Sequence, residues 1–212
     1  MKSLKEILSP FDSDRLAEWF YDLTVLWHDA VPIEPVERFA PQGMTQWVHY
    51  QNYILWHEED EVRRKDVPDA EIVRGKRAID RNNQVRSESI EQIDIWIDNV
   101  LKTAGINHPE DAEINSESPG SIIDRLSILS LKIFHMEEET RRKDVGDEHL
   151  KESGVRLGIL REQRSDLAKA LDVLFLDLMT GKKRHKVYRQ MKMYNDPRFN
   201  PAIYKNKESK KR

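Results

Sequence analysis

Two pairs of side chains in this sequence could bind a metal ion. His57 is followed three residues later by Asp60, and His135 is followed at the same spacing by Glu138. An i,i+3 spacing places both members of a pair on one face of a helix. Imidazole nitrogen and carboxylate oxygen are both ligands for divalent ions. If the two pairs converge, these four residues are predicted to hold one divalent ion, of Mg, Mn, Fe or Zn.

The two pairs lie in an internal repeat. HEEDEVRRKDVPD (57–69) aligns with HMEEETRRKDVGD (135–147) at an offset of 78 residues, and nine of the thirteen positions are identical. The offset continues without a gap on both sides of this motif. Self-similarity at a fixed offset is typical of duplicated structural units. We therefore predict two copies of one unit, at 41–101 and 119–179.

Each unit is predicted to form a helical hairpin. Apolar spacing favours helices at about 45–65 and 70–102, then at about 121–143 and 147–180, with a further helix at about 14–29. Asp69, Ser121 and Asp147 are the expected N-caps, and the RRK runs are expected in a last helical turn. Two hairpins that each leave an apolar face uncovered should pair. The expected fold is all-α, a four-helix bundle with an N-terminal helix and a basic C-terminal extension.

Further polar residues interrupt the apolar stripes of the predicted helices. Guanidinium groups bind phosphate oxygens with two hydrogen bonds, and metal ions commonly accompany phosphates. These features predict an enzyme or binder that acts on a phosphate-bearing metabolite, such as a nucleotide or nucleotide-sugar, with Glu61 or Glu139 as the general base. The predicted ligand-binding residues are Arg64, Asn83, Arg86, Arg142, Arg161 and Arg164.

A second interpretation needs no ligand. The same histidines, acids and arginines could form a structural network that fixes the pairing of two similar hairpins, in a non-catalytic scaffold or partner-binding protein. Whether the protein is an enzyme stays open at this stage. His28, next to Trp27 as His57 is next to Trp56, is interpreted as a packed or surface histidine rather than as a third ligand.

Composition excludes several classes of site. The 212 residues include no Cys, so disulfides, thiolate zinc sites and a Cys nucleophile are absent, and no glycine-rich nucleotide loop occurs. No apolar run reaches the roughly 18 residues of a membrane span, and the charged N-terminus is unlike a signal peptide. We therefore expect a cytoplasmic protein.

The charge is unevenly distributed along the chain. Residues 181–212 contain 12 Lys and Arg against 2 acidic residues, although the whole chain has a net charge of −3. A basic extension can bind polyanions or fold back on an acidic body. We favour a small anionic ligand over nucleic acid as partner, and self-association stays open. We expect one domain over 1–204 and a disordered basic tail over 205–212.

Three segments carry a resemblance to a known family. LWHEEDEVRRKDV (55–67), SPGSIIDRLSILSLKIFHME (118–137) and KMYNDPRFNPAIY (192–204) resemble the bacterial domain-of-unknown-function family 4254, over about 27–204. The family implies no activity for this chain. It does imply that the segment before residue 121 and the motif at 192–204 belong to the folded domain.

Overall fold

The computed structural model describes residues 3–189, 191, 193 and 196–204. These residues are mostly helical, which confirms the all-α prediction. The elements in chain order are α1 (Leu4–Leu8), the 3-10 helix η1 (Ser9–Phe11), α2 (Ser13–Asp29), α3 (Pro41–Glu61), α4 (Asp69–Thr103), β1 (Glu113–Ile114), α5 (Pro119–Arg141), α6 (Asp147–Met179) and β2 (Lys183–Arg184).

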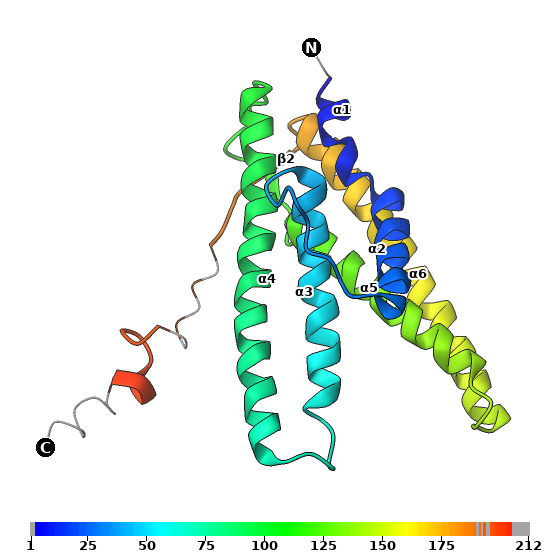
Figure 1. The fold of residues 1–212 in the computed structure, drawn as a ribbon. Helices are drawn as coiled ribbons and strands as arrows, with labels where there is room; N and C mark the ends of the chain where they lie inside the picture. The colour runs from blue at the N-terminus through cyan, green and yellow to red at the C-terminus, as the bar shows by residue number, and fades with distance from the viewer. Residues whose placement is uncertain (1–2, 190, 192, 194–195, 205–212) are drawn as a thin grey trace, which may run out of the picture.

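The four long helices form two hairpins. α3 packs against α4, and α5 packs against α6, each pair joined by a short turn (Figure 1). Pro41 and Pro119 begin α3 and α5, where the missing N–H of proline costs no helical hydrogen bond. The helices end earlier than predicted, at Glu61 and Arg141, so most of each RRK run lies in the turn and not in the last helical turn.

The predicted N-caps are displaced by a few residues. Ser118 caps α5, because its Oγ accepts a hydrogen bond from the backbone N–H of Ser121 at 3.2 Å. The acidic residues expected to cap α4 and α6 instead lie in the first turn, where negative charge complements the helix dipole. The observed N-caps are Pro68, Ser118 and Gly146, in place of Asp69, Ser121 and Asp147.

The two hairpins meet near one end and diverge toward their turns. α2 lies along α5 and α6, while α3 and α4 contact the other hairpin through α5 (Figure 1). The molecule is therefore V-shaped, with a two-helix arm and a three-helix arm, and the hairpins do not lie side by side along their whole length. In a closed four-helix bundle, the first hairpin (α3 and α4) would cover the second hairpin (α5 and α6) along its whole length. Here α2 covers part of the second hairpin instead. Its apolar stripe, which includes Leu16, Phe20 and Trp27, is buried there.

Most of the core lies where the arms meet. One large cluster joins η1, α2, α4, α5 and α6 through buried side chains such as Phe11, Phe20, Ile93, Leu126 and Leu171. A second, smaller cluster contains Trp27, Tyr53 and Leu131, from α2, α3 and α5. The smaller cluster fixes the relative positions of the three helices that carry the candidate site.

A glycine sets the closest approach of α4 and α5. The backbone N–H of Gly120 donates to Oδ1 of Asp94 at 2.8 Å, and a Cβ on Gly120 would lie 2.7 Å from the carbonyl oxygen of Ile90. Asp94 is buried, and burial raises the pKa of its carboxyl group despite hydrogen bonds from Ser118 and Gly120. The Ser-Pro-Gly sequence at the start of α5 thus fixes where the two arms cross.

The start of the basic extension is part of the fold. β2 pairs in parallel with β1, and Nζ of Lys183 donates to Oδ1 of Asn115 at 2.9 Å. Nε2 of His185 lies 2.9 Å from the carbonyl oxygen of Asp94 and anchors the chain on α4. The tail predicted at 205–212 lies outside the described residues. Within the part of the chain that is described, no helix is long and apolar enough to cross a membrane.

Candidate metal centre

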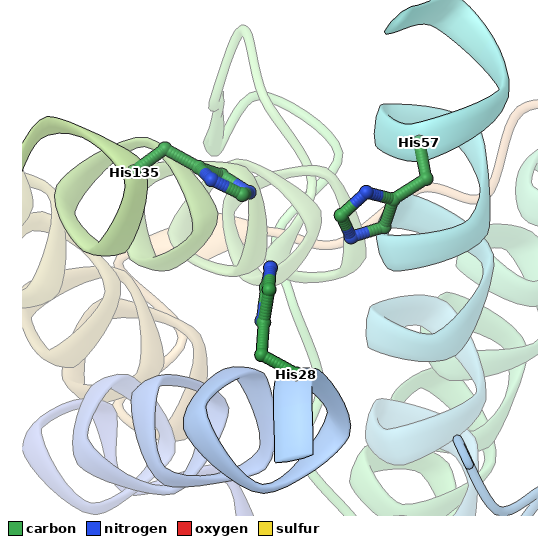
Figure 2. A group of neighbouring side chains, drawn as sticks. All are labelled: His28, His57 and His135. Atoms are coloured by element: carbon green, nitrogen blue, oxygen red, sulfur yellow. The ribbon is translucent and has the colours of Figure 1, made fainter. Parts of the chain in front are cut away.

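Three histidines converge where α2, α3 and α5 meet. His28 lies in the last turn of α2, His57 near the end of α3 and His135 on α5, and the three rings face one another in Figure 2. The ring centroids are 5.1 Å apart for His28 and His57, 5.0 Å for His28 and His135, and 5.7 Å for His57 and His135. One ring nitrogen of each residue lies within 4.8 Å of the other two. We call these three residues the histidine cluster.

Hydrogen bonds orient two of the three rings. Nδ1 of His28 lies 2.7 Å from the carbonyl oxygen of Thr24, which can only accept, so this nitrogen carries the proton. Nδ1 of His135 lies 2.9 Å from Oε2 of Glu138 and donates to that carboxylate. A neutral imidazole that donates from Nδ1 presents a lone pair at Nε2. These are the partners that orient histidine ligands in metal sites.

The Nε2 atoms of the histidine cluster have no hydrogen-bond partner. All three are buried, and no described protein atom donates to them or accepts from them. A buried nitrogen without a partner costs roughly 1–3 kcal/mol of desolvation. Three such atoms facing one another indicate a common ligand, because a packed histidine would normally have both ring nitrogens paired.

Aromatic rings surround the histidine cluster. Trp56 stacks on His135 at 4.8 Å and 6°, Phe134 stacks on His28 at 4.2 Å and 29°, and Tyr53 meets the edge of His57 at 4.5 Å. The Tyr53 hydroxyl donates to the carbonyl oxygen of Trp27 at 2.6 Å and ties the end of α2 to α3. These aromatic contacts hold the three histidine rings in place.

Burial lowers the pKa of His57 and of His135. The pKa of His57 is lowered by desolvation and then by the neighbouring charges of His28 and His135. The pKa of His135 is lowered mainly by desolvation, although Glu138 opposes this shift. Both rings are therefore neutral near pH 7, which is the protonation state that a metal ion requires.

The structure places the four predicted metal ligands in two roles. His57 and His135 belong to the histidine cluster, whereas Asp60 and Glu138 do not offer an oxygen to it. Glu138 orients His135, and the charge of Asp60 acts on both histidines from one turn further along α3. The third ring comes from His28, which the sequence favoured as a packed or surface residue. The sequence signal that could have identified His28 is the Trp before it, because Trp27-His28 matches Trp56-His57.

The arginines of the two RRKD motifs close the hairpin turns. Arg64 donates to Asp66 at 2.8 Å and to Glu61 at 2.9 Å. The equivalent residue of the second hairpin, Arg142, donates to Asp144 at 2.7 Å and to Glu139 at 3.0 Å. These contacts explain why the RRKD sequence recurs. The two predicted bases, Glu61 and Glu139, are both engaged in these pairs with arginine.

Arg86 belongs to a polar network inside the core. Its Nε and Nη2 donate to the two oxygens of Asp124, at 2.8 and 2.5 Å. Asn52 donates to Asp124 at 2.9 Å and to the hydroxyl of Ser127 at 3.0 Å. Ser127 in turn lies 2.8 Å from Nδ1 of His49, a ring that is fully buried. Arg86 therefore compensates a buried carboxylate, which is the structural interpretation of this residue.

The remaining predicted ligand-binding residues lie apart from the histidine cluster. Arg161 donates to Glu137 at 2.7 Å, and Tyr21 donates to the other oxygen of that carboxylate at 2.6 Å. Asn83 lines a surface hollow together with Arg86. Arg164 is half-buried on α6.

Acid is expected to destabilise the protein. Burial lowers the pKa of His49 to about 3, and the pKa values of His57 and His135 are also lowered. The unfolded chain therefore binds more protons, and stability falls as the pH drops below about 6.5, by up to about 1.4 kcal/mol per pH unit for each histidine. Urea unfolding of the metal-free protein at pH 7.5, 6.5 and 5.5 measures this slope. His135→Gln should reduce it, and a stability that is flat or rises toward pH 5.5 would contradict the expected proton uptake.

The fold and the histidine cluster define an all-helical protein with a candidate three-histidine metal centre. A family model described as "Protein of unknown function (DUF4254)" matches residues 44–187, and the chain belongs to this family. The match includes His57 and His135 but not His28 or the motif at 192–204. No curated protein and no solved structure matches the chain.

Proposed function

We propose that this protein binds one transition-metal ion of the zinc class at the histidine cluster and acts as a metal-dependent hydrolytic enzyme. The observation that carries the proposal is the convergence of three buried Nε2 atoms without partners. Imidazole suits Zn, Fe, Co, Ni and Cu, whereas Mg prefers oxygen ligands. Three histidine ligands with an open fourth position are typical of catalytic zinc.

The geometry requires a small adjustment when metal binds. Nitrogens held at 2.0–2.1 Å from one tetrahedral ion lie about 3.3 Å apart, and the ring nitrogens here lie within 4.8 Å of one another. The three rings lie on three different helices, so each side chain can rotate independently and bring its ring nitrogen closer to the other two. The carboxylates of Asp60 and Glu138 add negative charge near the rings, which favours a cation.

A bound ion would supply Lewis acidity at its open position. The protein would supply three neutral imidazoles, aromatic contacts that hold them in place, and Glu138 to hold His135 in orientation. Asp60, Glu138 and Glu139 all line the hollow next to His135, and we assign Asp60 as the general base because the other two bond to His135 and to Arg142 and His149. This assignment replaces Glu61 and Glu139.

We also infer that the chain arose by internal duplication. Residues 78 positions apart meet across the contact of α3 and α5. The rings of His57 and His135 are 5.7 Å apart, and Nδ1 of His49 lies 2.8 Å from Oγ of Ser127. Such contacts are expected between copies related by an approximate twofold axis. The metal would then bind close to this axis, with His28 as the ligand from outside the repeat.

Metal content tests the proposal directly. Protein freed of metal with a chelator and reloaded should bind one Co²⁺ or Zn²⁺ ion per chain, with visible absorption bands for the cobalt form. His28→Ala, His57→Ala and His135→Ala should each lose the ion. His149→Ala is the control and should keep it, because His149 is half-buried beside Glu139 and is not part of the histidine cluster. Stoichiometric binding that survives all three cluster substitutions would place the metal elsewhere.

A further inference from the structure

A hollow next to the histidine cluster has the features of a substrate pocket. It has a volume of about 580 Å³ and lies between α3, α5 and α6, with His135 in its wall. Small-molecule sites commonly have volumes of 300–1,000 Å³ and mostly apolar walls. We call it the His135 hollow. It shares Trp56 and Asp60 with a second hollow, which is lined by residues of α3, α4 and α5.

The wall of the His135 hollow is largely apolar. Trp56 comes from α3, Met136 from α5, and Ile159 and Leu160 from α6. The Ile159 side chain is 49% exposed, although it faces this concave surface. Covering apolar side chains with an apolar ligand removes their surface from water and is favourable in proportion to the area covered. The wall therefore fits an aromatic or aliphatic body.

One cation in the hollow is available to a ligand. Lys132 lies one helical turn before His135, lines the hollow, and makes no hydrogen bond or ion pair with any residue that the structure describes. Arg156, the other cation in the wall, is paired with Glu152 at 2.5 Å. Lys132 and His135, the residue of the histidine cluster that lines the hollow, are thus one helical turn apart on α5.

The acidic residues of the hollow are mostly paired. Glu138 bonds to His135, and Glu139 bonds to Arg142 and His149. Because His135 is neutral, its hydrogen bond does not cancel the charge of Glu138, so Asp60 and Glu138 carry two negative charges against the one positive charge of Lys132. With a divalent ion bound at the histidine cluster, the free charge around the hollow is positive, which favours an anion over a cation.

We propose that the His135 hollow binds a small amphipathic anion, with its carboxylate or phosphate head toward the metal and Lys132 and its apolar body against Trp56, Ile159 and Leu160. This inference rests on the proposed function, because the metal supplies part of the positive charge. It names a substrate class: acids or phosphate monoesters that carry an aromatic or aliphatic group.

Ligand titrations of the cobalt-loaded protein test this substrate class. The probes are phenyl phosphate and phenylacetate, each compared with its head group alone, inorganic phosphate or acetate, and with benzyl alcohol as the uncharged body. We expect at least one aromatic anion to change the visible cobalt spectrum and to bind about tenfold tighter than its head group. Benzyl alcohol should not compete at equal concentration. Whichever of phenyl phosphate and phenylacetate binds more tightly shows whether the hollow prefers a phosphate or a carboxylate head group.

Matched variants separate the two parts of the pocket. Lys132→Met should weaken the aromatic anion and its head group about equally, by roughly tenfold. Ile159→Asn should remove most of the advantage of the aromatic body. Lys151→Met and Val173→Asn, at exposed α6 positions that line none of these hollows, should change neither.

The outcomes distinguish the pocket from the metal centre. A protein that does not bind cobalt through the histidine cluster overturns the proposed function, and this inference with it. A protein that binds cobalt there, yet binds aromatic anions no better than their head groups, keeps the metal centre and overturns the pocket. Affinities unchanged by both Lys132→Met and Ile159→Asn would also overturn it.

Discussion

Saturating Zn²⁺ is expected to raise the melting temperature of this protein by roughly 5–10 °C. An ion that binds only the folded state, at 100 times its dissociation constant, adds about 2.7 kcal/mol to the free energy of unfolding. For a chain of this length, each kcal/mol raises the melting temperature by about 2–4 °C. Differential scanning calorimetry of the metal-free and zinc-loaded protein measures the shift.

Each cluster histidine should be necessary for this stabilisation. His28→Ala is the most informative change, because His28 lies on α2 and was not predicted as a ligand from sequence. Its loss should abolish the shift as completely as His57→Ala or His135→Ala does, while the metal-free variants remain folded. A zinc-dependent shift that persists in His28→Ala would remove His28 from the centre. The shift should also diminish below about pH 6.5, where protons compete for the imidazoles.

Replacement of Arg86 by Met is expected to destabilise the protein by roughly 3–5 kcal/mol, because it leaves the buried carboxylate of Asp124 without its cation. Asn52 still donates to this carboxylate, so the loss should lie toward the lower end of that range. Urea unfolding at pH 7 measures the change. The appropriate comparison is Arg164→Met, at the position 78 residues further along the chain. Arg164 makes no hydrogen bond or ion pair within the described residues, and its replacement should have a much smaller effect.

A double variant tests whether the Arg86 effect comes from the ion pair. Replacing both partners of a buried pair with apolar residues often restores stability, whereas removing one partner does not. Arg86→Met combined with Asp124→Leu should therefore lose less stability than the two single changes predict together. Equal losses for Arg86→Met and Arg164→Met would show that Asp124 does not depend on its partner.

The sequence predicted the helices and two of the three residues of the histidine cluster. The repeat with an offset of 78 residues identified His57 and His135 as equivalent, and the helical period placed both on the inner face. His28 could not be placed in the same way, because its position depends on how α2 docks on α5. That docking is fixed by contacts such as Tyr21 to Glu137, which link residues far apart in sequence.

The roles of the arginines also could not be predicted from sequence spacing. The pairing of Arg64 with Asp66 is local and recurs in both hairpins, so the identity of the RRKD motifs had a structural cause that spacing alone could not separate from ligand binding. The role of Arg86 could not be predicted without knowing which helix packs against α4. Its partner Asp124 is 38 residues away and lies on α5, which crosses α4 at Gly120.

The origin of His28 outside the two similar hairpins has a stereochemical consequence. Two equivalent rings alone would present nearly the same environment from either side of the contact between α3 and α5. The third ring and the Phe134 stacked on it block one side, while Trp56 covers His135 and borders the hollow. The surroundings of the cluster are therefore asymmetric, and if a metal binds there and the hollow takes the substrate as we propose, the two mirror images of a chiral substrate should bind with different affinities.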